Sequence, residues 1–298
     1  MKSLEILEFE RPSACDRIAL CRSFNSNFGG VAALLAATVD VPYRFFLSDR
    51  RGCGLWPDLT TEQLQQAQVV CLQGDSDQAI GNGERDRGGG YTGPRDRRCA
   101  QISDDDIYAH TALAHRAWLQ SWPQIIRWHW GDRRLLLGHG SPRQVNECAW
   151  ESDTTDQGIT DCLQETEVDG TLVTHMGRPW LRWGDPVCWC NVGVFGHPAH
   201  EGGDWTQLTF PGQAAQPVPQ MRPLTHDSQP VVATMTAAGL PAEFQASPLT
   251  NVWTTCAENL PDAERSVQSR FLSLSTWIAG TVVTSAILLL VFLFLFSL

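Results

Sequence analysis

Residues 69–77, VVCLQGDSD, join a short apolar run to a group of polar residues. A run of this length, rich in β-branched side chains and closed by glycine and aspartate, predicts a buried strand over Val69–Gln73. Asp75, Ser76 and Asp77 then follow the carboxyl end of that strand. In α/β sheets, ligands bind just beyond the carboxyl ends of the strands. This junction is therefore a candidate functional site.

The same kind of junction recurs along the chain. Apolar runs that end in a carboxylate or an imidazole are Tyr43–Ser48 before Asp49, Arg134–Gly138 before His139, and Thr171–Thr174 before His175. Further strands are predicted at Arg17–Cys21, Cys188–Val194 and Trp205–Phe210. The polar residues thus stand at the ends of several different strands.

Helical patterns alternate with these strands. They cover Val31–Val39, Thr60–Gln68, about His110–Ser121, and Val231–Ala238. We expect a long ordered loop over Gly81–Ser103, which is rich in Gly and Arg, and a Pro- and Gln-rich connection over Pro211–Pro223. The first fifteen residues carry no strong signal. Strands that alternate with helices predict an α/β fold.

Five of these strand-end side chains have the chemistry of metal ligands. They are Asp49, Asp75, Asp77, His139 and His175. Carboxylates and imidazoles both coordinate Mn, Fe or Zn. Each residue also has a simpler interpretation, because strand-end aspartates often cap the next helix and single histidines often serve as hydrogen-bonding groups. The set together indicates a metal site more strongly than any member alone.

The order of these segments resembles the calcineurin-like metallophosphoesterases, in particular the small bacterial phosphodiesterase type. The resemblance covers roughly residues 17–260. The matching segments are Ser48-Asp49 for Gly-Asp, Gly74–Asp77 for Gly-Asn-His-Asp, His139–Pro142 for His-Gly-Ser-Pro, Thr174–Gly177 for the last His motif, and Asn191–Gly193 with Gly196–Pro198 for a strand and turn. Gly90–Asp96 and Gly239–Pro241 are similar to one bacterial branch of the family.

This resemblance implies a four-layer α-β-β-α sandwich, in which two mixed sheets lie face to face with helices outside. It also implies a two-metal site at the strand ends. One of the two metal positions keeps its expected ligands, which are Asp49, Asp75, His139 and His175. One divalent ion (Mn, Fe or Zn) is the only cofactor that we expect.

The other metal position departs from the family pattern. Ser26 and Phe28 stand where the family has Asp and His, and Gly177 replaces the final His. A neighbouring register would place Asn25 and Asn27 there instead. We expect Ser26 and Phe28 to line this position, with the phenyl ring making it drier.

The general-acid His of the family is replaced by Ser76, whose hydroxyl titrates too high to protonate a leaving group near neutral pH. We therefore expect at most one metal ion and negligible phosphodiesterase activity, and we assign no catalytic residue.

The C-terminal residues 275–298, STWIAGTVVTSAILLLVFLFLFSL, carry no charge. About 20 apolar positions suffice to cross a bilayer, so this stretch predicts one transmembrane helix. A buried core helix and a lipid-anchor signal are the alternatives. Arg265 and Arg270 precede the span, which predicts a cytoplasmic N-terminal domain. The absence of an N-terminal signal and of glycosylation sequons agrees with that orientation.

The predicted organisation has four parts. They are an N-terminal segment (1–16), a metallophosphoesterase-like domain (17–262), a juxtamembrane linker (263–274) and the transmembrane helix (275–298).

The composition of the chain limits the classes of partner that it can bind. The formal charge of −11 argues against nucleic acid as a ligand, because phosphate backbones require a basic surface. Arg85–Arg98 is a local exception with five arginines, read as a solvated loop or as an anion or lipid-headgroup contact. We expect Cys188 and Cys190 to be buried structural thiols rather than zinc ligands. His197 and His200 are exposed loop residues or accessory ligands.

Two functions fit these features. The first is a membrane-anchored, non-catalytic accessory or scaffold subunit of a membrane protein complex, with the bilayer and other membrane proteins as partners. In that case Trp128, Trp130, Trp180 and Trp183 serve either an interface or the core. The second is a membrane-bound phosphodiesterase or phosphatase that works with one metal ion.

Overall fold

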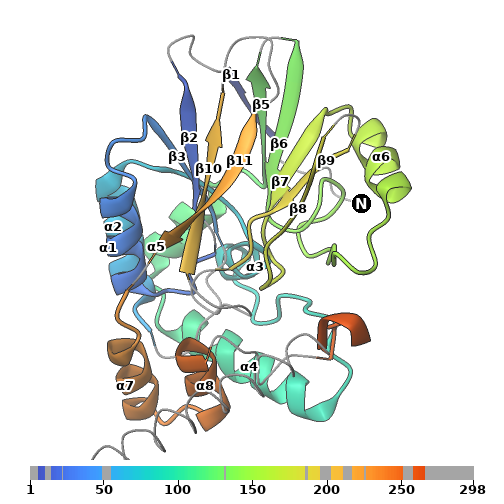
Figure 1. Ribbon diagram of the computed structural model, residues 1–298. Helices are drawn as coiled ribbons and strands as arrows, with labels where there is room; N and C mark the ends of the chain where they lie inside the picture. The colour runs from blue at the N-terminus through green and yellow to red at the C-terminus, as the bar shows by residue number, and fades with distance from the viewer. Residues whose placement is uncertain are drawn as a thin grey trace, which may run out of the picture. The chain divides into compact units, whose positions relative to one another are not determined.

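Two mixed β-sheets pack face to face in the computed structural model (Figure 1). The structure describes residues 6–10, 15–21, 23–48, 55–130, 132–184, 187–194, 203–210, 217–224, 226–250 and 258–265. The chain divides into two compact units, Met1–Asn259 and Leu260–Leu298. Both sheets belong to the first unit.

The five-stranded sheet provides the first strand ends of the site. Its order is β11 (Val218–Leu224), β10 (Gly203–Thr209), β2 (Arg17–Cys21), β3 (Tyr43–Leu47) and β4 (Val70–Leu72). Strands β2, β3 and β4 are parallel, with Cys21 opposite Phe46 and Leu47 opposite Leu72. Their carboxyl ends therefore lie side by side at one edge.

The six-stranded sheet provides the other strand ends of the site. Its order is β1 (Ile6–Glu10), β5 (Ile125–Trp130), β6 (Arg133–Gly138), β7 (Gly170–Val173), β9 (Cys188–Asn191) and β8 (Trp180–Trp183). Strands β6, β7 and β9 run parallel, so the residues after β6 and β7 meet at one edge.

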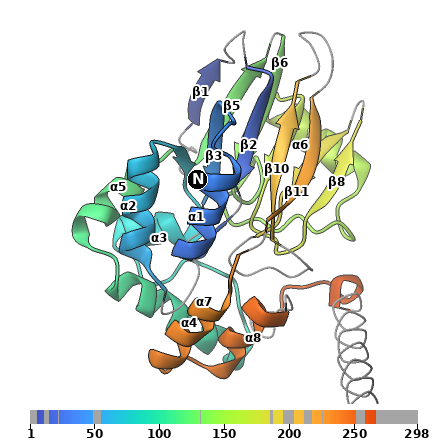
Figure 2. The same cartoon turned by 60° about the vertical axis from the view of Figure 1, so that its left-hand side comes forward.

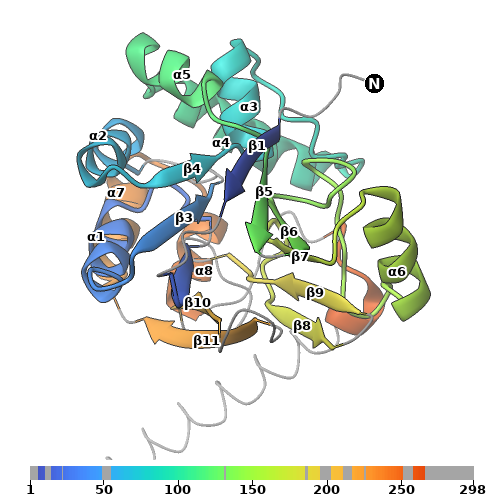
Figure 3. The same ribbon diagram turned by 90° about the horizontal axis from the view of Figure 1, so that it is seen from above.

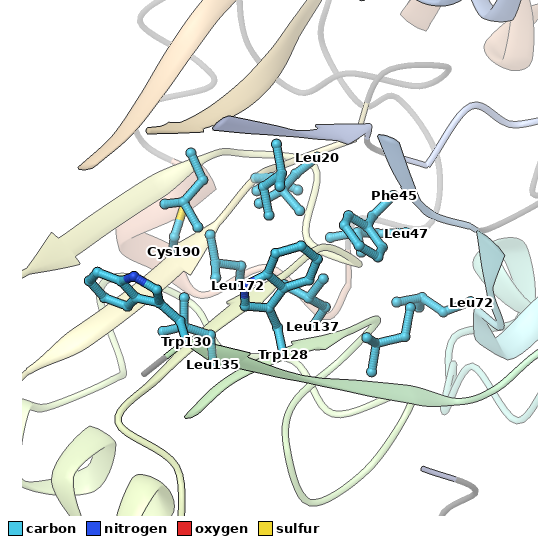
Figure 4. Packing of buried hydrophobic residues seen from close by; sticks show 14 of the residues in the cluster. Leu20, Phe45, Leu47, Leu72, Trp128, Trp130, Leu135, Leu137, Leu172 and Cys190 are labelled. Atoms are coloured by element: carbon cyan, nitrogen blue, oxygen red, sulfur yellow. The ribbon is translucent and has the colours of Figure 1, made fainter. Parts of the chain in front are cut away.

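The apolar faces of the two sheets form the main core (Figure 4). Trp128 is fully buried at its centre, stacked on Phe9 at a centroid distance of 4.9 Å and edge-on to Phe45 at 5.1 Å. Leucines from both sheets, Leu20 and Leu137 among them, surround these rings. Removal of this apolar surface from water is the main force that holds the sheets together.

Helices cover the outer faces (Figure 3). A second apolar cluster joins the five-stranded sheet to α1 (Phe28–Ala37), α2 (Pro57–Ala67), α3 (Asp75–Asn82) and α5 (Leu113–Gln120). Helix α6 (Asp156–Glu165) lies beside the six-stranded sheet. A third cluster joins α4 (Pro94–Ala109), α7 (Gln229–Ala237) and α8 (Ala242–Thr250), which lie together in Figure 2.

The predicted α/β fold with two sheets is confirmed, and the predicted strands match observed ones within a few residues. The loop prediction for Gly81–Ser103 was wrong over its second half, where α4 begins at Pro94. The polar composition concealed a helix that buries Cys99, Ser103 and Ile107 on one face. The connection predicted at Pro211–Pro223 likewise contains most of β11.

Six further described elements were not predicted: β1, β5, β8, α3, α6 and α8. Strand β1 pairs in parallel with β5, so residues 6–10 are part of the sheet. Of the four tryptophans assigned either to an interface or to the core, Trp128, Trp130 and Trp180 are buried, which supports core packing. Trp183 is partly buried and packs against the core between the sheets.

The two candidate zinc cysteines are both buried, as expected for structural side chains. Cys190 belongs to the core between the sheets, and Cys188 donates to the Gly184 carbonyl at 2.9 Å. Among the described helices, none has the length and apolar character to cross a bilayer. The predicted span at 275–298 lies outside the described residues.

Candidate metal centre

Asp75, His139 and His175 come together at the edge where the parallel strands end. One ligand atom from each lies within 4.8 Å of the others, and all three side chains are buried. His139 Nε2 is 3.3 Å from Asp75 Oδ1 and 3.0 Å from His175 Nδ1. Three of the four predicted ligands thus converge. Asp49, the fourth, lies outside the described residues.

Two of the three separations between these atoms fit ligands of one divalent ion. Adjacent ligands at about 2.0–2.1 Å from a tetrahedral or octahedral ion lie about 2.8–3.4 Å from one another. The two measured separations, 3.0 and 3.3 Å, fall in this range. One carboxylate and two imidazoles are also a donor set that suits Mn, Fe or Zn.

The backbone of His175 is strained. Its φ is +81°, in the left-handed region that residues with a Cβ seldom adopt. Such a conformation costs about 1–3 kcal/mol and is typical of functional sites. The strain turns the chain sharply after β7 and brings the ring of His175 beside that of His139, with centroids 4.8 Å apart.

Gly140 makes room for the turn that follows His139. A Cβ on Gly140 would lie 2.4 Å from the Val145 carbonyl oxygen and 2.6 Å from that of Gln144. The Ser141 hydroxyl accepts from the amides of Arg143 and Gln144 within this turn. The turn after His139 therefore requires a glycine at position 140, and the hydroxyl at position 141 stabilises it.

A buried arginine, which the sequence patterns did not single out, supplies positive charge beside the Asp75 carboxylate. Arg87 Nε is 3.8 Å from Asp75 Oδ2, and its Nη1 pairs closely with Asp104. The side chains of Arg87 and Asp75 are 4% and 3% exposed, so both charges are shielded from water. Arg87 belongs to the arginine-rich stretch that was predicted to be a solvated loop, and this member of it is instead buried.

The two oxygens of Asp75 consequently have different neighbours. Oδ1 faces His139, and Oδ2 faces Arg87. We call Asp75, Arg87, His139 and His175 the charged half of the site. Arg87 directs one carboxylate oxygen toward the imidazole pair, where an ion would be held.

Asp77 caps a helix, which was the alternative to a role as a metal ligand. Its Oδ2 accepts from the Gly74 amide at 3.0 Å, so it caps the first turn of α3. Ser76 is 3% exposed, and its Oγ has no hydrogen-bond partner among the described residues. The capping role of Asp77 explains an aspartate at this position without a metal ion.

The segment after β2 is polar but uncharged. Asn25 and Ser26 have positive φ values of 51° and 54° and are almost fully buried. Within the described part of the chain, neither Asn25 Oδ1 nor the hydroxyls of Ser26 and Ser48 find a partner. We call Asn25, Ser26, Ser48 and Ser76 the neutral half of the site.

Phe28 does not seal the neutral half. It is the first residue of α1, and 39% of its surface is exposed, so the expectation of a ring that dries this position was wrong. Asn27 caps α1 by accepting from the Gly30 amide, which leaves its Nδ2 facing His226 Nε2 at 2.9 Å. Burial lowers the pKa of His226, and Asp227 opposes this shift.

His226 had no sequence signal, because it stands in a polar segment between β11 and α7. The candidate accessory residues His197 and His200 lie outside the described residues.

A cavity of about 240 Å³ adjoins His175. Its other lining residues are mostly glycines, carboxamides and aromatics, namely Gly88, Gly89, Gly90, Tyr91, Gln144, Asn146, Cys148, Trp150, Met176 and Asn259.

Comparison with solved structures identifies the architecture. The structure of a metallophosphoesterase from Sphaerobacter thermophilus superimposes with a TM-score of 0.60 at 18% identity, over 79% of this chain and all of that one. The chain has the metallophosphoesterase fold. A hypothetical protein from Pyrococcus horikoshii OT3 gives a TM-score of 0.64 at 14% identity, over 77% of this chain and 96% of that one.

No family model and no curated protein matches the sequence. At these identities the likeness establishes the metallophosphoesterase fold, and the residues themselves must carry any argument about chemistry. Asp75, His139 and His175 stand at the strand ends where the family resemblance predicted ligands of a divalent ion.

Proposed function

We propose that this protein binds one divalent metal ion and, beside it, a phosphate group, and that it acts as a membrane-anchored accessory subunit with little or no hydrolytic activity. The observation that carries this proposal is the convergence of three buried ligand atoms from Asp75, His139 and His175. The fold supports a phosphoesterase-type function. The residues around it argue against efficient turnover.

When bound, the ion would supply positive charge that attracts and polarises a phosphate oxygen. The protein's own contribution is positional. Strained His175 and the turn at Gly140 fix the two imidazoles, and Arg87 fixes the carboxylate. These groups would hold the ion among buried side chains, where electrostatic attraction is stronger than in solution.

Hydrolysis needs more than this half-site provides. Two ions about 3.5–4 Å apart normally activate the nucleophile and stabilise the leaving oxygen. Ser26 and Gly177 offer no ligand comparable to a carboxylate or an imidazole, and Ser76 cannot supply a proton near neutral pH. Each 1.36 kcal/mol lost from transition-state stabilisation slows the reaction about tenfold.

The membrane part of the proposal is supported by the uncharged sequence of residues 275–298. Deletion from Phe271 onward should release the protein from membranes. Retention of the truncated protein on carbonate-washed membranes would contradict anchoring by this segment.

A one-metal phosphodiesterase or phosphatase is the second candidate. It is favoured by the intact charged half and by the cavity that His175 lines, which would be the place for a phosphate ester. It would require water to be activated at a single ion, without the second ion and without the general acid.

Metal analysis and a hydrolysis assay separate the two candidates. We expect purified full-length protein to bind one Mn(II) per chain in calorimetry and to hydrolyse bis-p-nitrophenyl phosphate no faster than the His139→Ala variant. Two ions per chain, with turnover that His139→Ala abolishes, would contradict the non-catalytic role. Absence of any bound metal would contradict the metal site itself.

A further inference from the structure

The neutral half contains buried hydroxyls that no described residue uses as a hydrogen-bond partner. Ser26, Ser48 and Ser76 are 0%, 0% and 3% exposed, and in the described part of the chain their Oγ atoms have no hydrogen-bond partner. A buried polar group without a partner is costly, so most are satisfied in folded proteins. Three at one edge of the sheets indicate that a group outside the chain uses them.

Each hydroxyl is tied by the backbone to the charged half. Ser76 is the neighbour of Asp75 in the first turn of α3. The Ser48 amide donates to the Leu72 carbonyl, so the end of β3 lies beside the end of β4, three residues before Asp75.

Ser26 is connected through the other sheet. Three residues before it, Ser23 forms a bridge with Val194, and its hydroxyl lies 3.4 Å from that of Thr174, the neighbour of His175. The parallel strands β2, β3 and β4 thus deliver all three hydroxyls to the edge that carries the imidazoles.

The replacement of a carboxylate by a serine at position 26 changes what this edge can bind. A carboxylate accepts hydrogen bonds and attracts cations, whereas a hydroxyl can donate to an anionic oxygen. An added carboxylate would also repel a phosphate group unless a second metal ion neutralised it. Uncharged hydroxyls remove that requirement.

We propose that Ser26, Ser48 and Ser76 form an oxyanion pocket that donates hydrogen bonds to the oxygens of a phosphate group bound beside the metal ion. The pocket corresponds to the position where the family resemblance places the first metal. This inference rests on the proposed function and specifies how the phosphate is held. Asn25, whose Oδ1 also lacks a partner within the described residues, provides an acceptor at the same edge.

The test uses binding and stability together, with inorganic phosphate as the probe. In Ser26→Ala/Ser48→Ala/Ser76→Ala, we expect the affinity for phosphate in the presence of Mn(II) to fall at least about tenfold, because hydrogen bonds to charged groups are among the stronger ones. The Mn(II) stoichiometry should stay at that of the wild type. The melting temperature without phosphate should stay equal or rise, since no hydrogen bond among the described residues is lost.

Thr38→Val is the matched control. Thr38 is also fully buried, but its hydroxyl donates to the Leu34 carbonyl at 2.8 Å at the opposite end of α1. This variant should melt at a lower temperature and bind phosphate as the wild type does. If the triple variant does not fold, Ser76→Ala alone should lower phosphate affinity about threefold, in keeping with one of several hydrogen bonds.

Three outcomes would overturn the pocket. They are a wild-type protein that does not bind phosphate, serine variants with unchanged phosphate affinity, and serine variants destabilised like Thr38→Val, which would show that the hydroxyls satisfy internal or water-mediated bonds. A wild type without Mn(II) would contradict the proposed metal function instead. In that case, phosphate binding by the wild type and the serine variants would be compared in metal-free buffer, and the same outcomes would support or overturn the pocket.

Discussion

The charged half and the neutral half of the site stand on the same edge of the sheets but differ in kind. Asp75, His139 and His175 lie within 4.8 Å of one another, with Arg87 balancing the carboxylate. Ser26 and Ser48, at the ends of β2 and β3, are as deeply buried and carry no charge. The backbone geometry of the fold is thus kept on both sides, while the capacity to hold a cation is kept on one.

This difference shows that fold and chemistry are separable. Parallel strands bring their carboxyl ends together whatever residues follow them, so the edge persists when its ligands change. Whether a metal ion binds then depends on a few side chains. Four experiments test this contrast between the halves, from the largest expected effect to the smallest.

Arg87→Met should have the largest effect. The substitution leaves Asp75 and Asp104 buried without their common cation, and the loss of one partner of a buried pair typically costs about 3–5 kcal/mol. Urea denaturation would measure the change. Arg17→Met is the control, because its pair with Asp40 is exposed and should contribute at most about 1 kcal/mol. Equal losses in both variants would show that the charged half does not depend on Arg87.

His139→Ala should separate the halves by metal affinity. Loss of a central ligand should weaken Mn(II) binding by about 100-fold or more, since substitutions of groups that only orient ligands already cost about 10–100-fold. Ser26→Ala should leave the Mn(II) affinity within about threefold of the wild type. Calorimetry would measure both, and similar affinities in the two variants would remove the distinction between the halves.

Ser26→Asp with Phe28→His should convert part of the neutral half into a second metal site. The pair introduces the two ligand types that the family resemblance implies at these positions, so we expect a second Mn(II) at high metal concentration and about tenfold faster hydrolysis. The exposed position of Phe28 limits this gain. Ser26→Ala with Phe28→Ala is the matched control. Unchanged stoichiometry would mean that the surrounding backbone, not only these side chains, has lost the second site.

His226 should give the smallest effect, through pH. Because burial lowers its pKa, the unfolded chain binds the proton more readily than the folded one. The stabilising contribution is therefore present above the ordinary histidine pKa of about 6.5 and is lost as the pH falls through the lower folded value. Protonation would also break the bond in which His226 Nε2 accepts from Asn27. Denaturation of wild type and His226→Gln at pH 5 and pH 8 measures this, and equal pH dependence would contradict it.

Local patterns were enough for much of the fold. The runs at Tyr43–Leu47 and Arg133–Gly138 are apolar, short and closed by polar residues, so each predicts a buried strand without reference to the rest of the chain. Strand β5 was missed because Arg127 and His129 interrupt its apolar residues. Their side chains pair with Glu8 on β1, a partner 119 residues away for Arg127 that no local pattern can reveal.

By itself, the sequence determined the α/β class, the strand ends and three residues that converge there, because periodicity and residue chemistry act over short distances along the chain. The tertiary structure alone decided that Arg87 is buried against Asp75, that Trp128 belongs to the core, and that Phe28 is partly exposed. It also decided that the hydroxyls of Ser26, Ser48 and Ser76 are buried without a partner within the described residues. Burial and pairing depend on segments far apart in the chain, and only packing brings those segments together.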